Sequence, residues 1–353
     1  RAVRLGTLRM STGAQLELLR EQGRAPSPAS RAEWRPLEAR ERGTQFLALP
    51  VRAVLNTPAA TGMNFWSLNP YVGCEFGCAY CYARDTHRYV VERAGQTAAA
   101  TPDWLDFERR ILVKTDAPGV LARTLDPARL AGRSLVIGTA TDPYQPAERR
   151  FRLTRSLLQT LLQWRGLSIG IITKSPLVVR DLDLLQRLVE RHEVSVNVSL
   201  ATLDARLARR LEPRTPVPRA RIRALARLTA GGIPAGLLVA PILPCLTDGR
   251  AALSALLAAA KAAGAHYVVG SALRLGPAAR RRFLPFLAAE FPELAARYER
   301  HYARRQTAGW NYQAALLSRL QDLQRRHGFE VTEGMRRRRQ LEGRAQNVQV
   351  QLL

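Results

Sequence analysis

The sequence predicts an α/β protein built on a parallel β-sheet, either barrel-like or doubly wound. Two observations predict it: short, apolar, β-branched segments recur along the chain, and amphipathic helical segments separate them. The apolar segments show little polar alternation, as expected for strands that are covered on both faces. From residue 66 onward six strands are expected, most of them followed by a helix and spaced roughly 25–40 residues apart after a longer first gap. This alternation is typical of a sheet assembled from βα units.

The expected strands begin with an extra strand that precedes the main series. In chain order they are Phe46–Val54, Trp66–Val72, Ser134–Thr139, Leu167–Thr173, Val194–Leu200, Ala235–Leu243 and Ala265–Val269. The series contains neither a GxGxxG after its first strand nor a GxxxxGK[ST] motif. The usual dinucleotide and phosphate-loop interpretations therefore lack support.

The expected helices are identified by their ends as well as by their apolar stripes. Ser175-Pro176 and Thr215-Pro216 each combine a capping hydroxyl with a proline suited to the first helical turn. The second of these helices ends at Gly231-Gly232, and a third opens at Thr247-Asp248 and stops at Gly264. A further amphipathic helix is expected over Ala147–Trp164.

Three regions differ in composition. Residues 1–45 are rich in Arg, Glu, Gly, Pro and Ser, and we expect them to form a basic, mobile extension. Residues 46–275 carry the strand–helix alternation. Residues 276–353 are expected to form a helical region, with helices over Arg280–Arg305 and Trp310–His327 and a basic tail at Arg336–Arg339.

The charge balance indicates a polyanionic partner. The 353 residues include 54 Lys and Arg against 29 Asp and Glu, a net charge of +25, which suits a nucleic acid or an acidic surface. Hydrophobic residues make up 46%, so general disorder is excluded. There is no run of 18 apolar residues and no apolar signal region, so we expect a cytoplasmic protein without a membrane span.

Three of the four cysteines fall within eight residues, at Cys74, Cys78 and Cys81. This grouping excludes a secreted disulfide scaffold and predicts a metal or iron–sulfur site in a reducing compartment. A [4Fe–4S] cluster normally takes four cysteines, and Cys245 is far along the chain, so three ligands would leave one iron open to a non-protein ligand. The alternative is a zinc site with His87 as fourth ligand, but Cys-x3-Cys-x2-Cys-x5-His is not a common zinc spacing. Gly73 and Gly77 allow the backbone to fold closely around the site.

The motif Cx3CxΦC, with Tyr80 as Φ and a strand before it, resembles the radical S-adenosylmethionine (radical SAM) superfamily. Within that superfamily the chain resembles the branch related to spore photoproduct lyase, often labelled DNA repair photolyase-like. The resemblance covers roughly residues 66–275 and is carried by NPYVGCEFGCAYCYAR, by TATDPYQPAE and ITKSPLVVRDLDLL, and by VSLATLDARLARRLEPRTPVPRARI and GIPAGLLVAPILPCLTD.

The resemblance implies a partial (β/α)6 barrel with the cysteine motif after its first strand. It also implies that Cys74, Cys78 and Cys81 hold a [4Fe–4S] cluster whose fourth iron is chelated by SAM. One electron from the reduced cluster would cleave SAM to methionine and a 5′-deoxyadenosyl radical, which abstracts a substrate hydrogen. An external electron donor such as flavodoxin or ferredoxin is then required.

Several candidate SAM contacts lie at expected strand ends, where parallel barrels place their active sites. Lys174 follows the third strand of the main series in a chain with only three lysines, and its ammonium suits the carboxylate of SAM. The alternative is a solvated loop lysine. By resemblance, Lys174 and Ser199 match SAM-contacting positions and Tyr80 approaches the adenine. The remaining expected contacts are Thr141 and Asp142, with Glu212 and Arg214 shaping the pocket.

The chain departs from spore photoproduct lyase at the hydrogen donor. That enzyme uses a cysteine after its second strand, whereas residues 138–142 read GTATD here. Repair of spore photoproduct by that route is therefore not expected. Cys245, just past the fifth strand, is a substitute candidate, although a small loop residue without a catalytic role is the simpler interpretation.

Arginine-rich segments and aromatic residues favour DNA or RNA as partner, with phosphate contacts and base stacking. The predicted function is a radical SAM enzyme acting on a nucleic-acid base, by lyase-like repair or by modification. The alternative functions are a radical SAM enzyme with a small-molecule or peptide substrate and a non-enzymatic zinc-containing nucleic-acid binder. For the arginines, the alternative is that they belong to solvated helix faces. The arginines and aromatics concerned are Arg206, Arg209, Arg210, Arg219, Arg221, Arg223, Arg227, Arg280–Arg282, Tyr298, Tyr302, Trp310 and Tyr312.

Overall fold

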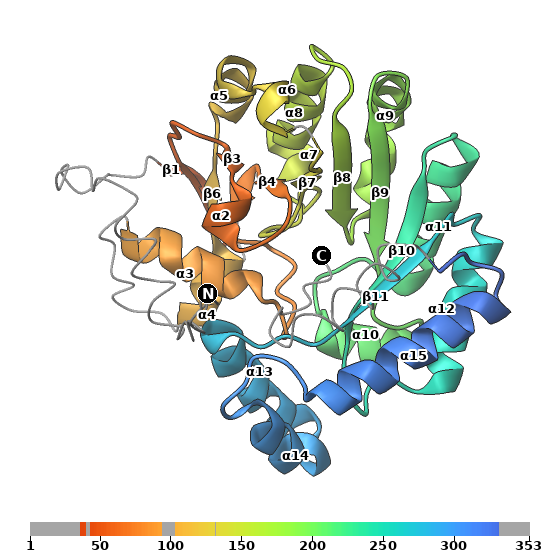
Figure 1. The fold of residues 1–353 in the computed structure, drawn as a ribbon. Coiled ribbons are helices and arrows are strands. Elements are labelled where there is room, and N and C mark those ends of the chain that lie inside the picture. Colours follow the sequence, from red (N-terminus) through yellow and green to blue (C-terminus); the bar gives the residue numbers. More distant parts are fainter. Residues whose placement is uncertain (1–35, 40–42, 94–102, 131, 332–353) are drawn as a thin grey trace, which may run out of the picture.

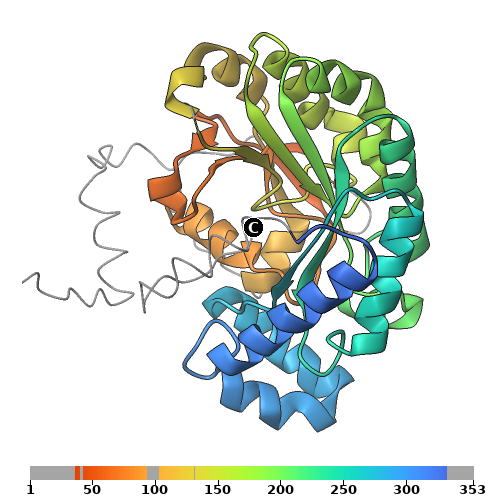
Figure 2. The ribbon, with the colours of Figure 1, turned by 45° about the vertical axis from the view of Figure 1, so that its right-hand side comes forward.

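The computed structural model describes residues 36–39, 43–93, 103–130 and 132–331 (Figure 1). Six parallel strands and one antiparallel edge strand form a curved sheet in the order β11-β10-β9-β8-β7-β4-β3, with β3 and β11 as its edges (Figure 2). The predicted α/β fold with a partial, open barrel of six parallel strands is thereby confirmed. The strands are β3 (Leu55–Asn56), β4 (Trp66–Leu68), β7 (Leu135–Ile137), β8 (Ser168–Thr173), β9 (Glu193–Ser199), β10 (Ala235–Ile242) and β11 (Val268–Ala272).

A second, four-stranded sheet lies beside the first strands of the barrel. Its order is β1-β2-β6-β5, formed by β1 (Pro36–Ala39), β2 (Gln45–Ala48), β6 (Arg110–Val113) and β5 (Tyr71–Val72). The short strand β1 falls within the stretch 1–45 that was expected to be an extension, whereas residues 1–35 lie outside the described residues. The division at residue 45 stays a prediction.

Of two expected strands, one is shortened and the other is divided between the two sheets. The stretch 46–54 contributes only its start to β2, and the chain passes Pro50 before β3 begins at Leu55. The stretch 66–72 separates into β4 and β5 at Asn69-Pro70, because proline has no N–H for a ladder and the Asn69 side chain turns to Thr139 and the backbone of Ala140. The strand expected over 265–269 is also displaced and forms β11.

Helices cover the outer, convex face of the sheet (Figures 1 and 2). The main core lies between these helices and the sheet, where apolar strand residues such as Ile171, Val196 and Leu237 meet helical leucines such as Leu185 and Leu225. The helices before residue 270 are α2 (Pro58–Thr61), α3 (Ala83–Arg93), α4 (Asp103–Arg109), α5 (Ala117–Thr124), α6 (Pro127–Leu130), α7 (Glu148–Phe151), α8 (Leu153–Leu161), the 3₁₀ helix η1 (Pro176–Asp181), α9 (Leu182–Val189), α10 (Ala205–Leu211), α11 (Pro218–Ala230) and α12 (Arg250–Ala262).

The capping predictions were partly right. The Ser175 hydroxyl accepts the Leu177 N–H, as expected, but it opens the 3₁₀ helix η1, and α9 follows. The other two expected starts are wrong: α11 and α12 begin at Pro218 and Arg250, behind Val217 and Gly249. Thr215 does not cap α11, because its hydroxyl bonds to Glu212.

One expected helix is broken by a buried side chain. The stretch 147–164 divides into α7 and α8 at Arg152, whose φ is +49°. The Glu148 carboxylate accepts the backbone N–H groups of Thr154 and Arg155, and so satisfies the free donors at the start of α8. The break is therefore stabilised by a tertiary contact that helical periodicity does not reveal.

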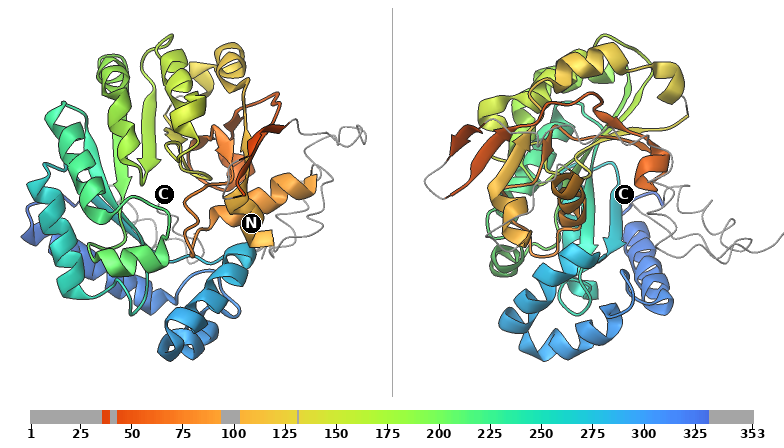
Figure 3. Two further views of the ribbon diagram at one scale, coloured as in Figure 1. Left: turned by 180° about the vertical axis from the view of Figure 1, so that it is seen from behind. Right: turned by 90° about the vertical axis from the view of Figure 1, so that its left-hand side faces the viewer.

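The C-terminal region is helical, and α13 (Pro277–Glu290), α14 (Pro292–Tyr302) and α15 (Trp310–Arg326) follow β11. Pro292 divides the helix expected over 280–305 into α13 and α14. Helix α13 packs on α3 and α4, while α15 packs on α12 and β11 (Figures 1 and 3). The arginine tail at 336–339 lies outside the described residues, and no helix within the described ranges could cross a membrane.

Candidate active site

The three grouped cysteines lie on one loop, residues 73–82, which we call the cysteine loop. It follows β5 and lies at the carboxyl ends of the central strands. Cys74 and Cys78 are buried, Cys81 is half-buried, and all three are free thiols. The loop backbone is fixed from two sides, because the Cys74 N–H donates to the Phe107 carbonyl at 2.8 Å and the Ala79 N–H to the Leu211 carbonyl at 3.0 Å.

Two glycines allow this close approach, as the sequence predicted. Gly73 and Gly77 have φ values of +88° and +63°, in the left-handed region that favours glycine. A Cβ on Gly73 would lie 2.9 Å from the backbone oxygen of Phe107 and 3.1 Å from that of Arg110. These backbone oxygens cannot move aside as the end of a side chain can.

Replacing Gly73 by alanine should therefore damage the loop. We expect Gly73→Ala to lower the free energy of unfolding by about 2 kcal/mol or more and to reduce the bound iron after reconstitution. The matched control is Gly62→Ala, because Gly62 also has a positive φ of +67° but no atom lies within 4 Å of the position that its methyl group would take. Thermal unfolding and iron analysis of both variants measure the difference, and equal losses in both would show that the contact to Phe107 is unimportant.

Polar side chains in the segment after β7 form hydrogen bonds to the backbone of the cysteine loop. Gln145 accepts the Glu75 N–H at 2.9 Å and donates to the Gly73 carbonyl, while the Glu75 carboxylate accepts the Ala147 N–H at 2.6 Å. Thr141, an expected SAM contact, donates its hydroxyl to the Gly73 carbonyl at 2.6 Å. Its side chain is thus engaged with the loop that carries the cysteines.

Asp142, another expected SAM contact, fixes the end of β8. Its buried carboxylate accepts the Thr173 hydroxyl and the Lys174 N–H, both at 2.7 Å, and the Tyr144 N–H at 2.9 Å. Burial raises the pKa of Asp142, and these hydrogen bonds oppose the rise. The three donors account for the orientation of this side chain, which sets the backbone from which Lys174 projects.

Lys174, Ser199, Tyr80 and Glu212 meet at the carboxyl ends of β8 and β9. The Lys174 ammonium donates to the Ser199 hydroxyl at 2.9 Å, pairs with the Glu212 carboxylate at 3.1 Å and lies 3.3 Å from the Tyr80 hydroxyl. Tyr80 also donates to Glu212. The alternative of a solvated loop lysine is wrong, because Lys174 has these three partners and is only 15% exposed.

A second cation sits behind Glu212. Arg221 is fully buried, and it donates to the Glu212 carboxylate and to the Ser199 carbonyl. Burial alone would raise the pKa of Glu212, but Lys174 and Arg221 lower it to about 2. Two cations thus share one carboxylate, which leaves surplus positive charge beside the cysteine loop.

The charges around the loop act on the cysteines in both directions. Burial raises the pKa of all three thiols. Glu212 raises the pKa of Cys78 further and Lys174 opposes this rise, while Arg84 and Lys174 oppose the rise at Cys81. Among the residues that the structure describes, no three His, Cys, Asp or Glu side chains are arranged to hold a single metal ion. The thiols of a four-iron cluster bind different iron atoms, so they need not converge on one point.

A buried ion pair that the sequence analysis missed lies on the other side of the loop. Glu108, in α4, binds Arg84 at 2.6 Å, and Arg84 also donates to the Cys78 carbonyl at 3.0 Å. Arg214 crosses over Gly77 to reach the same carboxylate. Arg214 was expected to shape the SAM pocket, but its guanidinium pairs with Glu108 over the cysteine loop. No spacing in the sequence links Glu108 to the cysteines.

His87 and Cys245 have their own surroundings. The His87 ring packs edge-on against Phe107, with Nε2 3.4 Å from the Arg110 carbonyl. Cys245 is exposed in the loop after β10, has a φ of +62° and donates its N–H to Asp248. This hydrogen bond ties Cys245 to its own loop, at the start of the segment that leads into α12.

The expected nucleic-acid surface is smaller than predicted. Tyr298 and Tyr302 are buried and stack on each other, with hydroxyls bonded to the carbonyls of Pro244 and Leu273. Arg221 is buried as well, so these three residues cannot contact a nucleic acid directly. Trp310 is 65% exposed at the start of α15, and Tyr82 is 40% exposed directly after Cys81.

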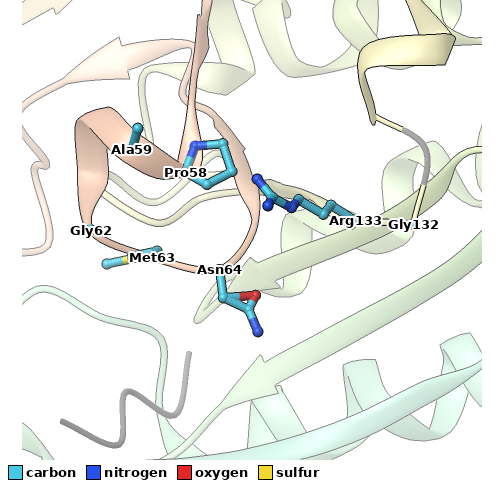
Figure 4. A pocket seen from close by; sticks show the side chains of 7 residues that line it. All are labelled: Pro58, Ala59, Gly62, Met63, Asn64, Gly132 and Arg133. Atoms are coloured by element: carbon cyan, nitrogen blue, oxygen red, sulfur yellow. The ribbon is translucent and has the colours of Figure 1, made fainter. Parts of the chain in front are cut away.

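A pocket near the start of the barrel strands lies away from the cysteine loop. It has a volume of about 650 Å³ and lies where β4 and β7 begin, lined by Pro58, Ala59, Gly62, Met63, Asn64, Gly132 and Arg133 (Figure 4). These residues precede the strands, whereas the cysteine loop and Lys174 lie where strands end. Parallel barrels carry their chemistry at the carboxyl ends, so this pocket is not part of the candidate site.

Comparisons with known proteins agree with this arrangement. The family model of the radical SAM superfamily matches residues 68–255. An uncharacterised protein of Mycobacterium tuberculosis is 36% identical over 264 residues, which cover 74% of this chain and 75% of the relative. An uncharacterised protein of Methanocaldococcus jannaschii is 28% identical over 204 residues, covering 58% and 70% of the two chains.

The fold is similar to that of solved structures as well. Spore photoproduct lyase complexed with dinucleoside spore photoproduct superposes with a TM-score of 0.56 at 14% identity, covering 87% of this chain and 85% of that one. At this identity the likeness shows a shared fold.

Proposed function

Because the chain belongs to the radical SAM superfamily, we propose that Cys74, Cys78 and Cys81 hold a [4Fe–4S] cluster and that SAM binds beside Lys174. The observation that carries the proposal is the position of three free thiols next to the Lys174–Glu212 pair, at the carboxyl ends of neighbouring parallel strands. When bound, these cofactors would supply the radical chemistry that removes a hydrogen atom from the substrate.

The residues present fit both groups. The loop supplies three thiols, and Lys174 and Arg84 add positive charge that suits an anionic iron–sulfur cluster. Lys174 is already oriented by Glu212 and Ser199, so its ammonium needs little reorganisation to receive the SAM carboxylate. We propose that the ring of Tyr80, whose hydroxyl is held by Glu212 and Lys174, would contact the adenine of SAM. Thr141 and Asp142 act as positioning residues, because they hold the cysteine loop and the base of Lys174.

We infer that the substrate is a nucleic acid. Arg274 follows the edge strand β11, and its charge opposes the rise that burial causes in the pKa of Tyr82, which stands directly after the cysteines and donates its hydroxyl to the Thr139 carbonyl. The backbone of Arg274 pairs with Thr307, three residues before the exposed Trp310. Exposed aromatic rings beside arginines suit stacking of unpaired bases, and the net charge of +25 suits phosphates. The fold shared with a lyase that binds a dinucleoside photoproduct supports the same class.

The proposal does not extend to the hydrogen donor of that lyase. Residues 138–142 contain no cysteine, and Cys245 lies in an exposed loop whose N–H is fixed by Asp248. Base modification, or repair with a different donor, is therefore the reaction class that we propose.

Anaerobic reconstitution tests the enzymatic function. The protein loaded with iron and sulfide should form 5′-deoxyadenosine from SAM when dithionite is added, and single-stranded DNA or RNA should increase the rate. A fully loaded protein that forms no 5′-deoxyadenosine would contradict the proposal. Cleavage that proceeds but is indifferent to every nucleic acid tried would retain the enzyme and remove the substrate class.

Trp310 provides a direct test of the nucleic-acid surface. We expect Trp310→Ala to weaken binding of a labelled single-stranded oligonucleotide by roughly 5- to 100-fold, because stacking on an aromatic ring contributes about 1–3 kcal/mol per base. Fluorescence anisotropy at two salt concentrations measures the loss. Trp310→Phe retains an aromatic face and should recover most of the affinity, and unchanged binding in Trp310→Ala would show that bases stack elsewhere.

A further inference from the structure

A pocket of about 400 Å³ lies against the cysteine loop, on the side of the central strands. Its walls come from the segments after β7, β8 and β9, and Phe76 of the cysteine loop contributes to its lining. Phe76 stands between Cys74 and Cys78 in the sequence, so the pocket touches the loop between two of the proposed iron ligands. We call six of its lining residues the Phe76 face: Phe76, Pro146, Arg149, Arg214, Thr215 and Pro216.

The Phe76 face is separate from the open edge of the barrel. Arg274 and Trp310 follow β11, at the edge of the sheet, whereas the Phe76 face is built from the central strands β7 to β9. A substrate that enters at the open edge would leave the Phe76 face exposed to solvent. The face therefore allows a second macromolecule to approach the cysteine loop while substrate is bound.

The charge of this face is strongly positive. Arg149 and Arg214 are exposed at the pocket, and Arg214 shares the single carboxylate of Glu108 with the buried Arg84. One wall is formed by residues 214–216, which belong to the segment 204–219. That segment carries five arginines against two acidic residues, one of which is the buried Glu212, and one of the five, Arg210, pairs with Glu290. A partner that covers the face must therefore bring negative charge.

We infer that the Phe76 face is the docking surface for a small acidic electron-transfer protein of the flavodoxin or ferredoxin kind. The inference rests on the proposed function, which requires one electron per SAM cleaved. The carrier loses one electron and the iron–sulfur cluster gains it, with no bond formed and no proton moved. Phe76 itself is buried, at 3% exposure, so the half-buried Pro146 and Pro216 supply the accessible apolar part of the face, beside the exposed Arg149 and Arg214. An apolar centre with arginines around it is the usual plan of a protein–protein contact, and complementary charge guides such encounters.

A charge reversal at Arg149 tests the surface without touching the proposed cofactor site. We expect Arg149→Glu to weaken the binding of purified flavodoxin by roughly three- to tenfold and to reduce its dependence on salt. The matched control is Arg227→Glu, which makes the same charge change at an exposed position near the other end of α11. Affinities are measured by anisotropy or calorimetry, which require no turnover.

The outcomes separate this inference from the proposed function. Dithionite-driven formation of 5′-deoxyadenosine should be unchanged in Arg149→Glu, while the flavodoxin-driven reaction needs more flavodoxin for half-maximal rate. Equal flavodoxin affinity in both variants and in the wild type would overturn the docking surface. A loss of oligonucleotide binding in Arg149→Glu with flavodoxin binding intact would overturn it too and assign the face to nucleic acid. Failure of the dithionite reaction in the wild type would instead contradict the proposed function.

Discussion

Replacing Cys78 by alanine should abolish both iron loading and SAM cleavage. Cys78 lies on a turn that is fixed by Arg84, which donates to its carbonyl, and by the neighbouring Ala79, whose N–H binds Leu211. The two thiols that remain cannot take its place, because the same contacts hold the loop backbone. We expect iron to fall from about four atoms per chain to well below one. Iron analysis, visible absorbance and 5′-deoxyadenosine formation measure the loss.

The fourth cysteine supplies the control for this experiment. Cys245 is exposed after β10, so Cys245→Ala should load as much iron as the wild type. A loss of iron in Cys245→Ala would make it a ligand and leave no open iron for SAM. Survival of full iron loading in Cys78→Ala would show that the ligand assignment is wrong.

Replacing Lys174 by methionine should weaken SAM binding while leaving the fold intact. Methionine retains the length of the side chain but not the ammonium that pairs with Glu212. A hydrogen bond to a charged group contributes about 1.5–3 kcal/mol, so we expect SAM to bind roughly 10- to 100-fold more weakly. Glu212 remains neutralised by Arg221, so thermal stability should change little. Calorimetric titration of SAM into the reconstituted protein gives the affinity.

Two further variants show whether the effect belongs to the site. Lys261 lies on helix α12, and its ammonium donates to the Gly328 carbonyl. Lys261→Met removes this ammonium and should leave SAM affinity unchanged. Glu212→Gln leaves buried Arg221 without its carboxylate and should cost about 3–5 kcal/mol of unfolding free energy. Equal SAM affinity in Lys174→Met and the wild type would remove Lys174 from the binding site.

The pH dependence of this ion pair has a defined sign. Lys174 and Arg221 hold the pKa of Glu212 at about 2, below its ordinary value of 4.5, against the effect of burial. A carboxyl whose folded pKa is lowered stabilises the fold above its ordinary pKa. The contribution of Glu212 is therefore complete above that value and is lost as the pH falls toward 2.

The sequence predicted the parts of the site that depend on chain order. Strand ends of a parallel sheet meet at one edge, so the meeting of Lys174 and Ser199 followed from the expected strands alone. The glycines at 73 and 77 were also predictable, because their conformations are set locally.

The contacts that the sequence did not predict depend on the directions in which side chains point. Thr141 and Asp142 stand at the expected strand end, yet their side chains bind the cysteine loop and the backbone of β8. Arg221 and Tyr298 look like surface residues in a basic, amphipathic pattern, but a buried carboxylate and a stacked ring hold them inside. Tertiary partners of this kind have no periodicity or spacing that a sequence displays.

Mössbauer spectroscopy of protein reconstituted with isotopically enriched iron tests the central claim, that three cysteines leave one iron for SAM. We expect the signals of a four-iron cluster, in which SAM changes the signal of one iron and leaves the others as they were. The same spectra should be obtained from Cys245→Ala. Spectra that SAM does not alter, or a protein that takes up a single zinc ion in place of iron, would contradict the claim that three cysteines leave one iron for SAM.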